Sequence, residues 1–272
     1  MRKVVTDERT DFTGRVALGR TGISVSRLGL AGGYGVGAEA VERAYYEFGI
    51  NYFYWSTPRR GRFGDGLRRL IKSHRDEIVI VLQSYGHVGR LAERAVHKGL
   101  KSLGIDYCDA LLLGWHNRMP SRGVIDSVTD LKRRGLVRAI AMSGHNRKFF
   151  GQLAGQPDSP IDIFMIRYNA AHRGAETEIF PLLPESNRPG VTIYTATSWG
   201  KLLKKRKMPP GQRPLTAAEC YRFVLSNPHV DLCMMGPRNE QEMRQGLTAL
   251  SQGPVGDEEV RRFVEIGDHV HG

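Results

Sequence analysis

Side chains able to transfer protons or to bind anions follow apolar, strand-like segments throughout this chain of 272 residues. Tyrosine hydroxyls and imidazole rings can exchange a proton with a substrate, and guanidinium groups bind oxyanions. The candidate catalytic residues are Tyr54, Arg59, Gln83, Tyr85, His116, His145 and Arg167. If the segments are parallel strands, their carboxyl ends meet at one edge, and we expect these side chains to form one site there.

Two of these candidates are histidines that follow neighbouring predicted strands. His116 precedes Asn117, so it can act as a general acid with the amide as its orienting partner. His145 and Asn146 repeat this arrangement one strand later, which allows the two rings to approach each other. For both histidines, an exposed loop residue or a helix cap is the structural alternative. No third His, Cys, Asp or Glu completes a set of ligands, so we expect no metal.

Arg167 follows the apolar residues 163–166 and needs a partner of opposite charge. Burial of an unpaired guanidinium is costly, so a charged residue at the end of a strand must be paired or face the open edge. One interpretation is contact with the anionic group or carbonyl of a ligand. The other is a structural ion pair with an Asp or Glu elsewhere, and the sequence favours neither.

The segment Gly236-Pro237-Arg238-Asn239 ends the last predicted strand and leads into a helix that begins near Glu240. Backbone N–H groups at the start of a helix attract phosphate, and Arg238 adds a charge-assisted contact that can be bidentate. We therefore expect an anion site at this position.

Glycines 33, 35 and 37 also follow a predicted strand and precede a helix, as in dinucleotide-binding turns. The spacing of the third glycine differs, and residues 51–57 contain no acidic side chain to bind a ribose. This pattern favours a tight turn between strand and helix.

Apolar runs alternate with amphipathic helical patterns along the chain, which is typical of βα units in a parallel sheet. The predicted strands cover residues 28–31, 51–56, 77–83, 109–113, 137–142, 163–168, 191–196 and 231–235. Helical patterns include residues 38–48, 91–103, 124–134, 217–225 and 240–250. Eight such units predict an α/β fold, a single (β/α)₈ TIM barrel that forms one domain over residues 1–272.

Short segments flank the predicted barrel. Residues 15–26 have β-prone arms around two glycines and predict an N-terminal hairpin, with a flexible leader over residues 1–12. Residues 256–267 predict a short C-terminal surface helix.

The chain carries 40 Lys and Arg against 28 Asp and Glu, a formal net charge of +12. Most basic residues are dispersed, so we expect an anionic small molecule or cofactor as the partner and no nucleic acid. Lys201, Lys204 and Lys205 are placed to flank the anion near Arg238, although a solvated loop is the simpler account of the last two.

The sequence also predicts where the protein resides. No segment has the about 18 apolar residues that a membrane helix needs, and the N-terminus lacks the apolar part of a signal peptide. Three scattered cysteines show neither disulfide nor metal spacing. These features predict a soluble cytoplasmic protein, and they are compatible with a monomer or a homo-oligomer.

Five segments, in order, resemble the aldo-keto reductase superfamily. They are LGRTGISVSRLGL, FGINYF, GLKSLGIDYCDALLLGWH, RRGLVRAIAMSGHN and GPRNEQEMRQGLTAL. The resemblance covers most of the chain and implies a (β/α)₈ barrel. It also implies NADP(H) bound at the carboxyl ends of the strands and reduction of a carbonyl by hydride transfer.

The resemblance places the family's catalytic Asp, Tyr, Lys and His at Tyr54, Arg59, Gln83 and Gly114. All four residue types are therefore replaced. An arginine cannot readily donate a proton, because its pKa lies above about 12. Gln83 brings no charge that would acidify a neighbouring hydroxyl, so the family's standard mechanism does not transfer to this chain.

The cofactor positions implied by the resemblance are Ser143, Met165, Thr195, Trp199, Gly200, Gly236, Arg238 and Asn239. On the nicotinamide side, Gly144 and Met165 stand where the family has Asn and Gln. Thr195 stands where it has a stacking Tyr, although Tyr194 and Trp199 are close by.

The end that binds the 2′-phosphate is better kept, at Arg238, but the family's later Arg and Asn fall on Glu242 and Gly246. The family's longer C-terminal loop often helps to close the pocket, whereas here only residues 268–272 follow the last predicted helix. We expect an open or differently covered mouth, with His269 and His271 either reaching the site or lying free.

Three functions follow from these features. The first is an oxidoreductase that uses NADP(H) on a carbonyl or alcohol, with a strand-end Tyr or His as proton donor and Arg59 or Arg167 stabilising an oxyanion. The second is a non-redox barrel enzyme (a lyase, isomerase or hydrolase) that uses the same residues. The third is a catalytically inactive protein that binds NADP(H) or a partner.

Overall fold

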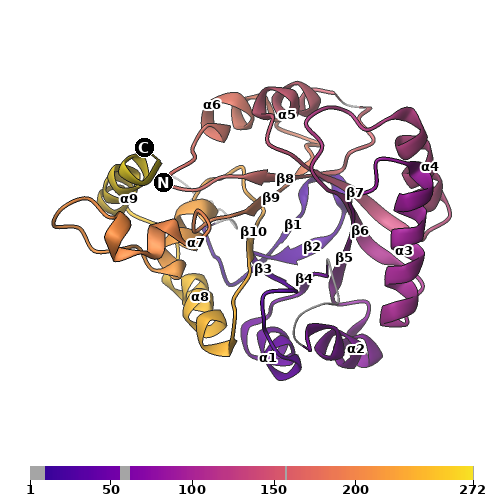
Figure 1. Cartoon of the computed structure of the whole chain (residues 1–272), viewed down its shortest axis with the longest axis horizontal. Coiled ribbons are helices and arrows are strands. Elements are labelled where there is room, and N and C mark those ends of the chain that lie inside the picture. Colours follow the sequence, from indigo (N-terminus) through magenta and orange to yellow (C-terminus); the bar gives the residue numbers. More distant parts are fainter. Residues whose placement is uncertain (1–9, 56–61, 157, 272) are drawn as a thin grey trace, which may run out of the picture.

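The computed structural model describes residues 10–55, 62–156 and 158–271. Eight parallel strands form a closed barrel in the order β10-β3-β4-β5-β6-β7-β8-β9, and helices surround it (Figure 1). The strands are β3 (Leu28–Ala31), β4 (Tyr52–Tyr54), β5 (Val79–Ser84), β6 (Cys108–Leu113), β7 (Val137–Ser143), β8 (Ile163–Arg167), β9 (Gly190–Tyr194) and β10 (Leu232–Met235). The predicted (β/α)₈ barrel is confirmed.

The helices alternate with the strands as the apolar periodicity indicates. They are α1 (Ala38–Phe48), α2 (Phe63–His74), α3 (Gly89–Leu103), α4 (Arg122–Arg133), α5 (Arg147–Ala154), α6 (Ala175–Glu178), α7 (Ala217–Leu225), α8 (Glu240–Gln252) and α9 (Asp257–His271). Short 3₁₀ turns are η1 (Gly19–Thr21), η2 (Phe180–Leu182), η3 (Lys201–Leu203) and η4 (Lys205–Lys207). The last two occupy much of the connection after β9.

The C-terminal helix is longer than predicted. We expected it to end at Gly267, but α9 continues to His271. Gly267 is a packing residue, because a Cβ there would overlap the backbone of Ala170 and Ala171. The glycine lets the helix approach this backbone closely, and it does not end the helix.

A hairpin closes the amino end of the barrel. β1 (Arg15–Ala17) pairs antiparallel with β2 (Ser24–Ser26), as predicted. Val16 and Val25 belong to the same buried cluster as the inward-facing barrel residues Tyr52 and Val79. Ligands therefore enter from the opposite end, where the strands finish.

Three aspartates, of which Asp109 and Asp231 are buried, tie the strands together near their amino ends. Asp109, Asp162 and Asp231 accept backbone N–H groups of Ile80, Ile140 and Val191 at 2.9, 2.8 and 2.9 Å. Each also pairs with a cation, Arg75, Lys132 or Arg188. Because these carboxylates have structural partners at the closed end, they are not candidates for chemistry at the mouth.

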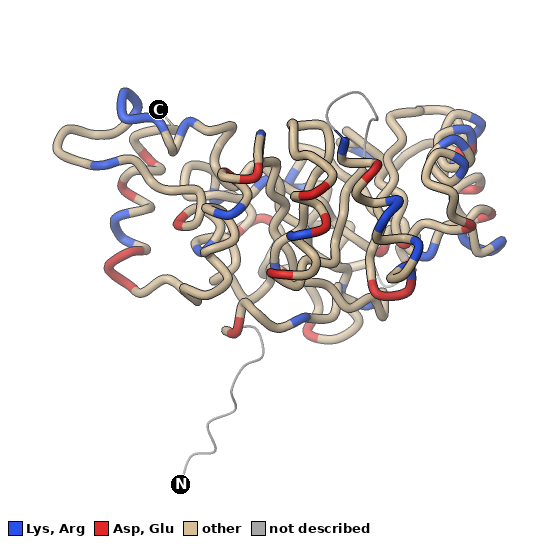
Figure 2. Tube along the Cα trace, turned by 90° about the horizontal axis from the view of Figure 1, so that it is seen from below, with Lys and Arg blue, Asp and Glu red and all other residues tan. Residues whose placement is uncertain are grey.

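Basic and acidic residues are interspersed over the surface of the molecule (Figure 2). None of the helices in the described ranges is long and apolar enough to span a bilayer.

Candidate active site at the mouth of the barrel

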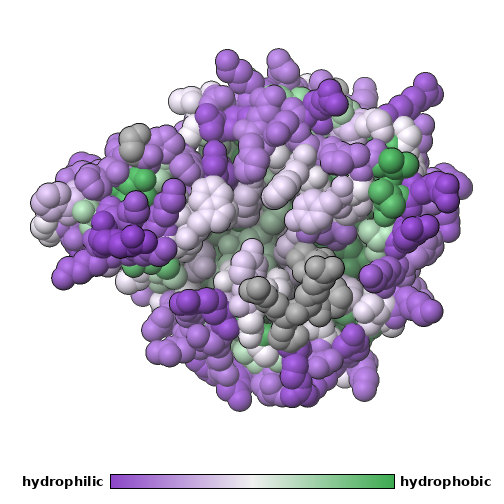
Figure 3. Space-filling model, in the orientation of Figure 1, coloured by the Kyte–Doolittle hydropathy of each residue, from purple (hydrophilic) through white to green (hydrophobic). Residues whose placement is uncertain are grey.

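The carboxyl ends of the strands surround a hollow with an apolar floor at the centre of one face (Figure 3). Alternate residues of a strand point to the same side. Tyr54, Val81 and Met165 pack with the cluster inside the barrel. Gln83 and Arg167 follow two residues after Val81 and Met165, so they lie on the inward side at the upper end of β5 and β8.

Tyr54 and Gln83 form a hydrogen-bonded pair at this mouth. β4 and β5 pair in parallel with Tyr54 opposite Val81, which places Gln83 one inward position higher. The Tyr54 hydroxyl donates to Oε1 of Gln83. The resemblance places the family's Asp and Lys at these two positions, and the two side chains here form an uncharged pair with one hydroxyl proton.

The resemblance places the family's catalytic His at Gly114, and the space beside this glycine is filled. A Cβ at this position would lie 2.5 Å from the Tyr85 ring and 2.8 Å from Nε2 of Gln83. The Tyr85 ring also packs edge-on against Trp115, with ring centres 5.7 Å apart. A side chain at position 114 thus requires Tyr85 to turn away.

His116 lies apart from the Tyr54–Gln83 pair. Its ring is 5% exposed and packs against His87 at 4.9 Å between centres. Burial, and secondarily the charge of His87, lower the pKa of His116. Its Nε2 is buried and has no hydrogen-bond partner among the residues that the structure describes. Asn117, which we expected to orient this ring, instead accepts backbone N–H groups of the next loop.

That next loop carries His145, and its ring does not pack against His116. The Asn117 side-chain oxygen accepts the His145 N–H at 2.7 Å and so holds the start of the β7–α5 loop. Nδ1 of His145 lies 3.3 Å from the Tyr194 hydroxyl at the end of β9. Burial, with a contribution from the charge of Arg167, lowers the pKa of His145.

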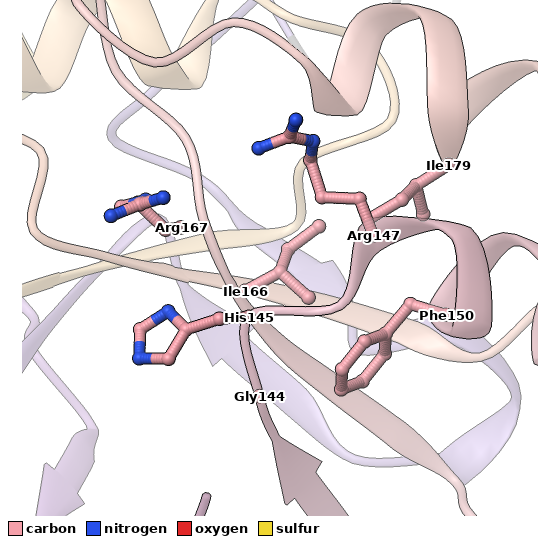
Figure 4. Close-up of a pocket in the computed structure, with 7 residues that line it drawn as sticks. All are labelled: Gly144, His145, Arg147, Phe150, Ile166, Arg167 and Ile179. Carbon is pink, nitrogen blue, oxygen red and sulfur yellow. The ribbon is translucent and has the colours of Figure 1, made fainter. Parts of the chain in front are cut away.

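Arg167 and His145 line a small pocket between the ends of β7 and β8. Both side chains project to the same side, away from the apolar residues of the pocket (Figure 4). The Arg167 guanidinium lies over the Trp199 ring at 5.6 Å from its centre. No ion pair joins it to a carboxylate in the described ranges. The structural ion pair that the sequence left open is therefore not observed.

The C-terminal helix reaches this side of the mouth. Nδ1 of His271 lies 2.8 Å from Nδ1 of His172, whose ring packs edge-on against Trp199 at 6.0 Å between centres. His271 is thus placed beside the site, while His269 is exposed. Burial, followed by the charge of Arg167, lowers the pKa of His172.

On the nicotinamide side of the mouth, the resemblance keeps the family's Ser at Ser143 and places Gly144 and Met165 where the family has Asn and Gln. The Ser143 hydroxyl accepts the Trp115 N–H at 3.2 Å, and the Met165 side chain offers no hydrogen bond of ordinary strength. At Gly144, a Cβ would overlap the carbonyl oxygen of His116, so the family's Asn has no room. Trp199, 55% exposed, offers an indole ring for stacking.

The connection after β9 presents Trp199 through an unusual backbone. Thr195, Ser198 and Trp199 all have positive φ angles (60°, 49° and 54°), followed by Gly200 at 76°. The Thr195 carbonyl accepts the side-chain N–H of Asn169 at 2.7 Å, which holds the first of these turns. Positive φ is uncommon for residues other than glycine, and it often marks a functional loop.

Arg238, where the resemblance places the contact to a 2′-phosphate, already forms an ion pair with Glu242. Glu242 accepts the Arg238 backbone N–H at 2.9 Å and its Nε–H at 2.8 Å, and these bonds lower the pKa of the carboxyl. Asn239 caps α8 by accepting the Glu242 N–H. Gly236 lies under the Tyr34 ring, which would meet a Cβ at 2.7 Å.

Arg59 lies outside the described residues. The sequence identified Tyr54, Gln83, Tyr85, His145 and Arg167 at strand ends and noted Tyr194 only as a neighbour of Thr195, and it assigned no role to His172 or Tyr34. A signal existed for Tyr194, which is two residues after the inward-facing Thr192. A signal also existed for Glu242, since it lies four residues after Arg238 and can reach it along a helix.

The chain folds as a (β/α)₈ barrel. In this fold, ligand sites lie at the carboxyl ends of the strands, where the candidate residues are found. The sequence model of the Aldo/keto reductase family matches residues 38–219. This match spans more than half of the chain, which belongs to the aldo-keto reductase family. Family and fold support an oxidoreductase of the aldo-keto reductase type.

Solved structures of similar fold carry the same family name. Aldo-keto reductase AKR11C1 from Bacillus halodurans, in its holo form, superposes with a TM-score of 0.74 at 18% identity. The match covers 95% of this chain and 99% of that one. A protein from Pseudomonas aeruginosa assigned as an aldo-keto reductase gives 0.66 at 21% identity over 92% and 99% of the two chains. No curated protein sequence matches the chain.

Proposed function

We propose that this protein is an oxidoreductase that uses NADP(H) to interconvert a carbonyl and an alcohol on a small molecule, with Tyr54 as its proton donor. The observation that carries the proposal is the Tyr54–Gln83 hydrogen bond at the inward ends of β4 and β5. These are the positions of the family's Asp and Lys.

Two features of this chain's own residues support a role for Tyr54. The hydroxyl holds a transferable proton at the mouth, and Gln83 fixes the position of the hydroxyl by accepting its hydrogen bond. To protonate a developing alkoxide, the O–H turns from Oε1 of Gln83 to the substrate oxygen, and the tyrosinate left behind regains a proton from water. The Gln83 amide nitrogen lies beside Gly114, where it can donate to a carbonyl oxygen of the substrate. Because Gln83 is uncharged, proton transfer lacks the electrostatic assistance of a lysine, and we expect slow turnover.

The residues of this chain suit the phosphate end of the cofactor better than its nicotinamide end. NADPH supplies hydride when it is bound. Arg238 and the start of α8 suit its 2′-phosphate in kind, provided that Glu242 releases the guanidinium. Met165 offers a carboxamide no hydrogen bond of ordinary strength, and only the Ser143 hydroxyl keeps a proton to donate to it. We therefore expect binding to depend mainly on the phosphate end and on stacking against Trp199.

Replacement of Glu242 tests this account of the phosphate end. Glu242→Gln should free Arg238 and tighten NADPH binding by about fivefold, since an exposed ion pair of this kind contributes up to about 1 kcal/mol. NADH, which has no 2′-phosphate, should bind with unchanged affinity. Arg238→Ala should weaken NADPH binding and leave NADH binding unchanged, as measured by calorimetric titration of both nucleotides.

The matched control for this test lies on the same helix turn. Glu240 pairs with Arg43 and Arg244, not with Arg238. Glu240→Gln should therefore leave the preference for NADPH over NADH unchanged. Equal changes for both nucleotides in Glu242→Gln would show that Arg238 does not bind the 2′-phosphate.

A second candidate is a protein that binds NADP(H) without catalysis. The filled space at Gly114 and the uncharged Tyr54–Gln83 pair favour it, because both remove groups that serve the family's proton transfer. Purified protein with NADPH and a panel of aldehydes, ketones and alcohols separates the two. NADPH binding with no oxidation of the cofactor by any carbonyl would establish the second candidate.

A further inference from the structure

Arg167 differs from other arginines near the mouth in having no carboxylate partner. Arg147 pairs with Glu178, Arg173 with Asp268 and Arg238 with Glu242. In residues 10–55, 62–156 and 158–271, Arg167 forms neither an ion pair nor a hydrogen bond with an Asp or Glu. Residues 56–61, which follow β4, contain no acidic side chain in the sequence.

The contact that Arg167 does make leaves its hydrogen-bond donors available. The guanidinium stacks over the face of Trp199, 5.6 Å from the ring centre. Such stacking uses the flat face of the group and leaves its N–H edge free for a planar, bidentate acceptor. It also restricts the side chain to one orientation, which reduces the entropy lost when a ligand binds.

The surroundings of Arg167 suit an anion. The pocket places Gly144 and His145 beside it, with the apolar Phe150, Ile166 and Ile179 behind. Its charge lowers the pKa of His145, as a secondary cause after burial. The nearby imidazoles and the Tyr194 hydroxyl are all groups that donate hydrogen bonds to oxyanions.

We propose that Arg167 binds an oxyanion of the substrate, a carboxylate or a phosphate group, at one side of the mouth. β8 lies opposite β4 in the ring of strands, so a molecule held by Arg167 faces Tyr54 from the other side of the mouth. The substrate class is thus a small carbonyl compound with an acidic group at its other end. Its carbonyl part rests on the function proposed above, whereas the anion site does not.

Direct binding measurements without cofactor test the anion site. The probes are 4-formylbenzoate, 4-formylphenyl phosphate and the uncharged methyl 4-formylbenzoate, each titrated by calorimetry. We expect one of the anionic probes to bind at least about tenfold more tightly than the ester. The tighter of the two identifies the oxyanion as a carboxylate or a phosphate.

Variants assign this preference to Arg167. Arg167→Met should abolish the preference for the anionic probes. Arg167→Lys, which keeps the charge but loses the planar guanidinium group, should show a smaller preference than the parent protein. Lys98→Met is the matched control, because it removes one positive charge from an exposed position of α3 and should leave the preference intact. Thermal melting of each variant confirms folding, and Arg167→Gln replaces the methionine variant if that fails to fold.

Three results would overturn the proposal. The ester can bind as tightly as both anionic probes, or Lys98→Met can reduce the preference as much as Arg167→Met does. The third is that Arg167→Met weakens NADPH binding tenfold and keeps the preference for the anionic probes, which would assign the guanidinium to the cofactor's phosphates.

The binding test is independent of turnover. If the anionic probes bind through Arg167 and no carbonyl is reduced, the proposed reductase function fails and the anion site stands. If the ester and the anionic aldehydes are bound and reduced equally well, the reductase function stands and the anion site fails.

Discussion

Replacement of Tyr54 by Phe is expected to reduce turnover by about 10²–10⁴-fold, the range that a positioned general acid contributes. The variant removes the hydroxyl proton and leaves the ring, which packs against the core inside the barrel. NADPH affinity should stay within about twofold, because the hydroxyl bonds to Gln83 and not to the proposed phosphate site. The measurement is oxidation of NADPH at a saturating concentration of the best carbonyl substrate.

Companion variants separate Tyr54 from its neighbours. Gln83→Leu should reduce turnover less than Tyr54→Phe, because it removes the orienting acceptor but keeps the proton. Tyr85→Phe removes the hydroxyl of an adjacent tyrosine that is 55% exposed and packs against Trp115. A loss of turnover of about 10²–10⁴-fold in Tyr85→Phe, together with normal turnover in Tyr54→Phe, would identify Tyr85 as the proton donor.

Restoration of the family's Asn at position 144 is expected to destabilise the fold by about 3 kcal/mol or more, the cost of overpacking a closely packed site. A Cβ at Gly144 would overlap the His116 carbonyl oxygen and lie 2.9 Å from the Phe150 ring. The backbone of His116 cannot move aside as an exposed side chain can, because its N–H donates to the carbonyl oxygen of Ser143 at 2.7 Å. Urea unfolding of Gly144→Asn measures the loss.

Two other glycine substitutions serve as comparisons. Gly114→His meets the ring of Tyr85, a side chain that can rotate into solvent, so its cost should be smaller and should fall further when Tyr85→Ala is added. Gly123→Ala in α4 meets no atom within 4 Å and should stabilise the helix by up to about 1 kcal/mol. A Gly144→Asn protein that unfolds at the same urea concentration as the parent would contradict the overlap.

Because these glycines are closely packed, we expect that a single substitution at any of them would not recreate the family's site. At Gly114 the space is taken by Tyr85, at Gly144 by the His116 backbone, and at Gly246 by the Tyr221 ring, 2.9 Å from a Cβ. The family residues are absent, and neighbouring groups fill the volume that they would need. A change of mechanism toward that of the family therefore requires coordinated substitutions at each position.

The sequence by itself determined the barrel. Eight apolar runs separated by amphipathic helical patterns specify (β/α)₈ topology. The spacing of apolar residues, every two in a strand or every 3.6 in a helix, indicates the type of each element and the face that it buries. The same periodicity placed Tyr54, Gln83 and Arg167 at the inward carboxyl ends of strands. Glycine was harder to interpret, since Gly267 is a packing residue within α9 and not its end.

Only the tertiary structure decided which side chains meet. The sequence left two possibilities for Arg167, and its contact with Trp199 in place of a carboxylate depends on the positive φ angles of the loop after β9. The sequence allowed His116 and His145 to approach each other, but the ring of His116 is buried against His87 from another loop. A local sequence pattern specifies only the face of its own strand or helix on which a side chain lies. The partners at the mouth come from separate connections, whose conformations depend on long-range packing that no local pattern records.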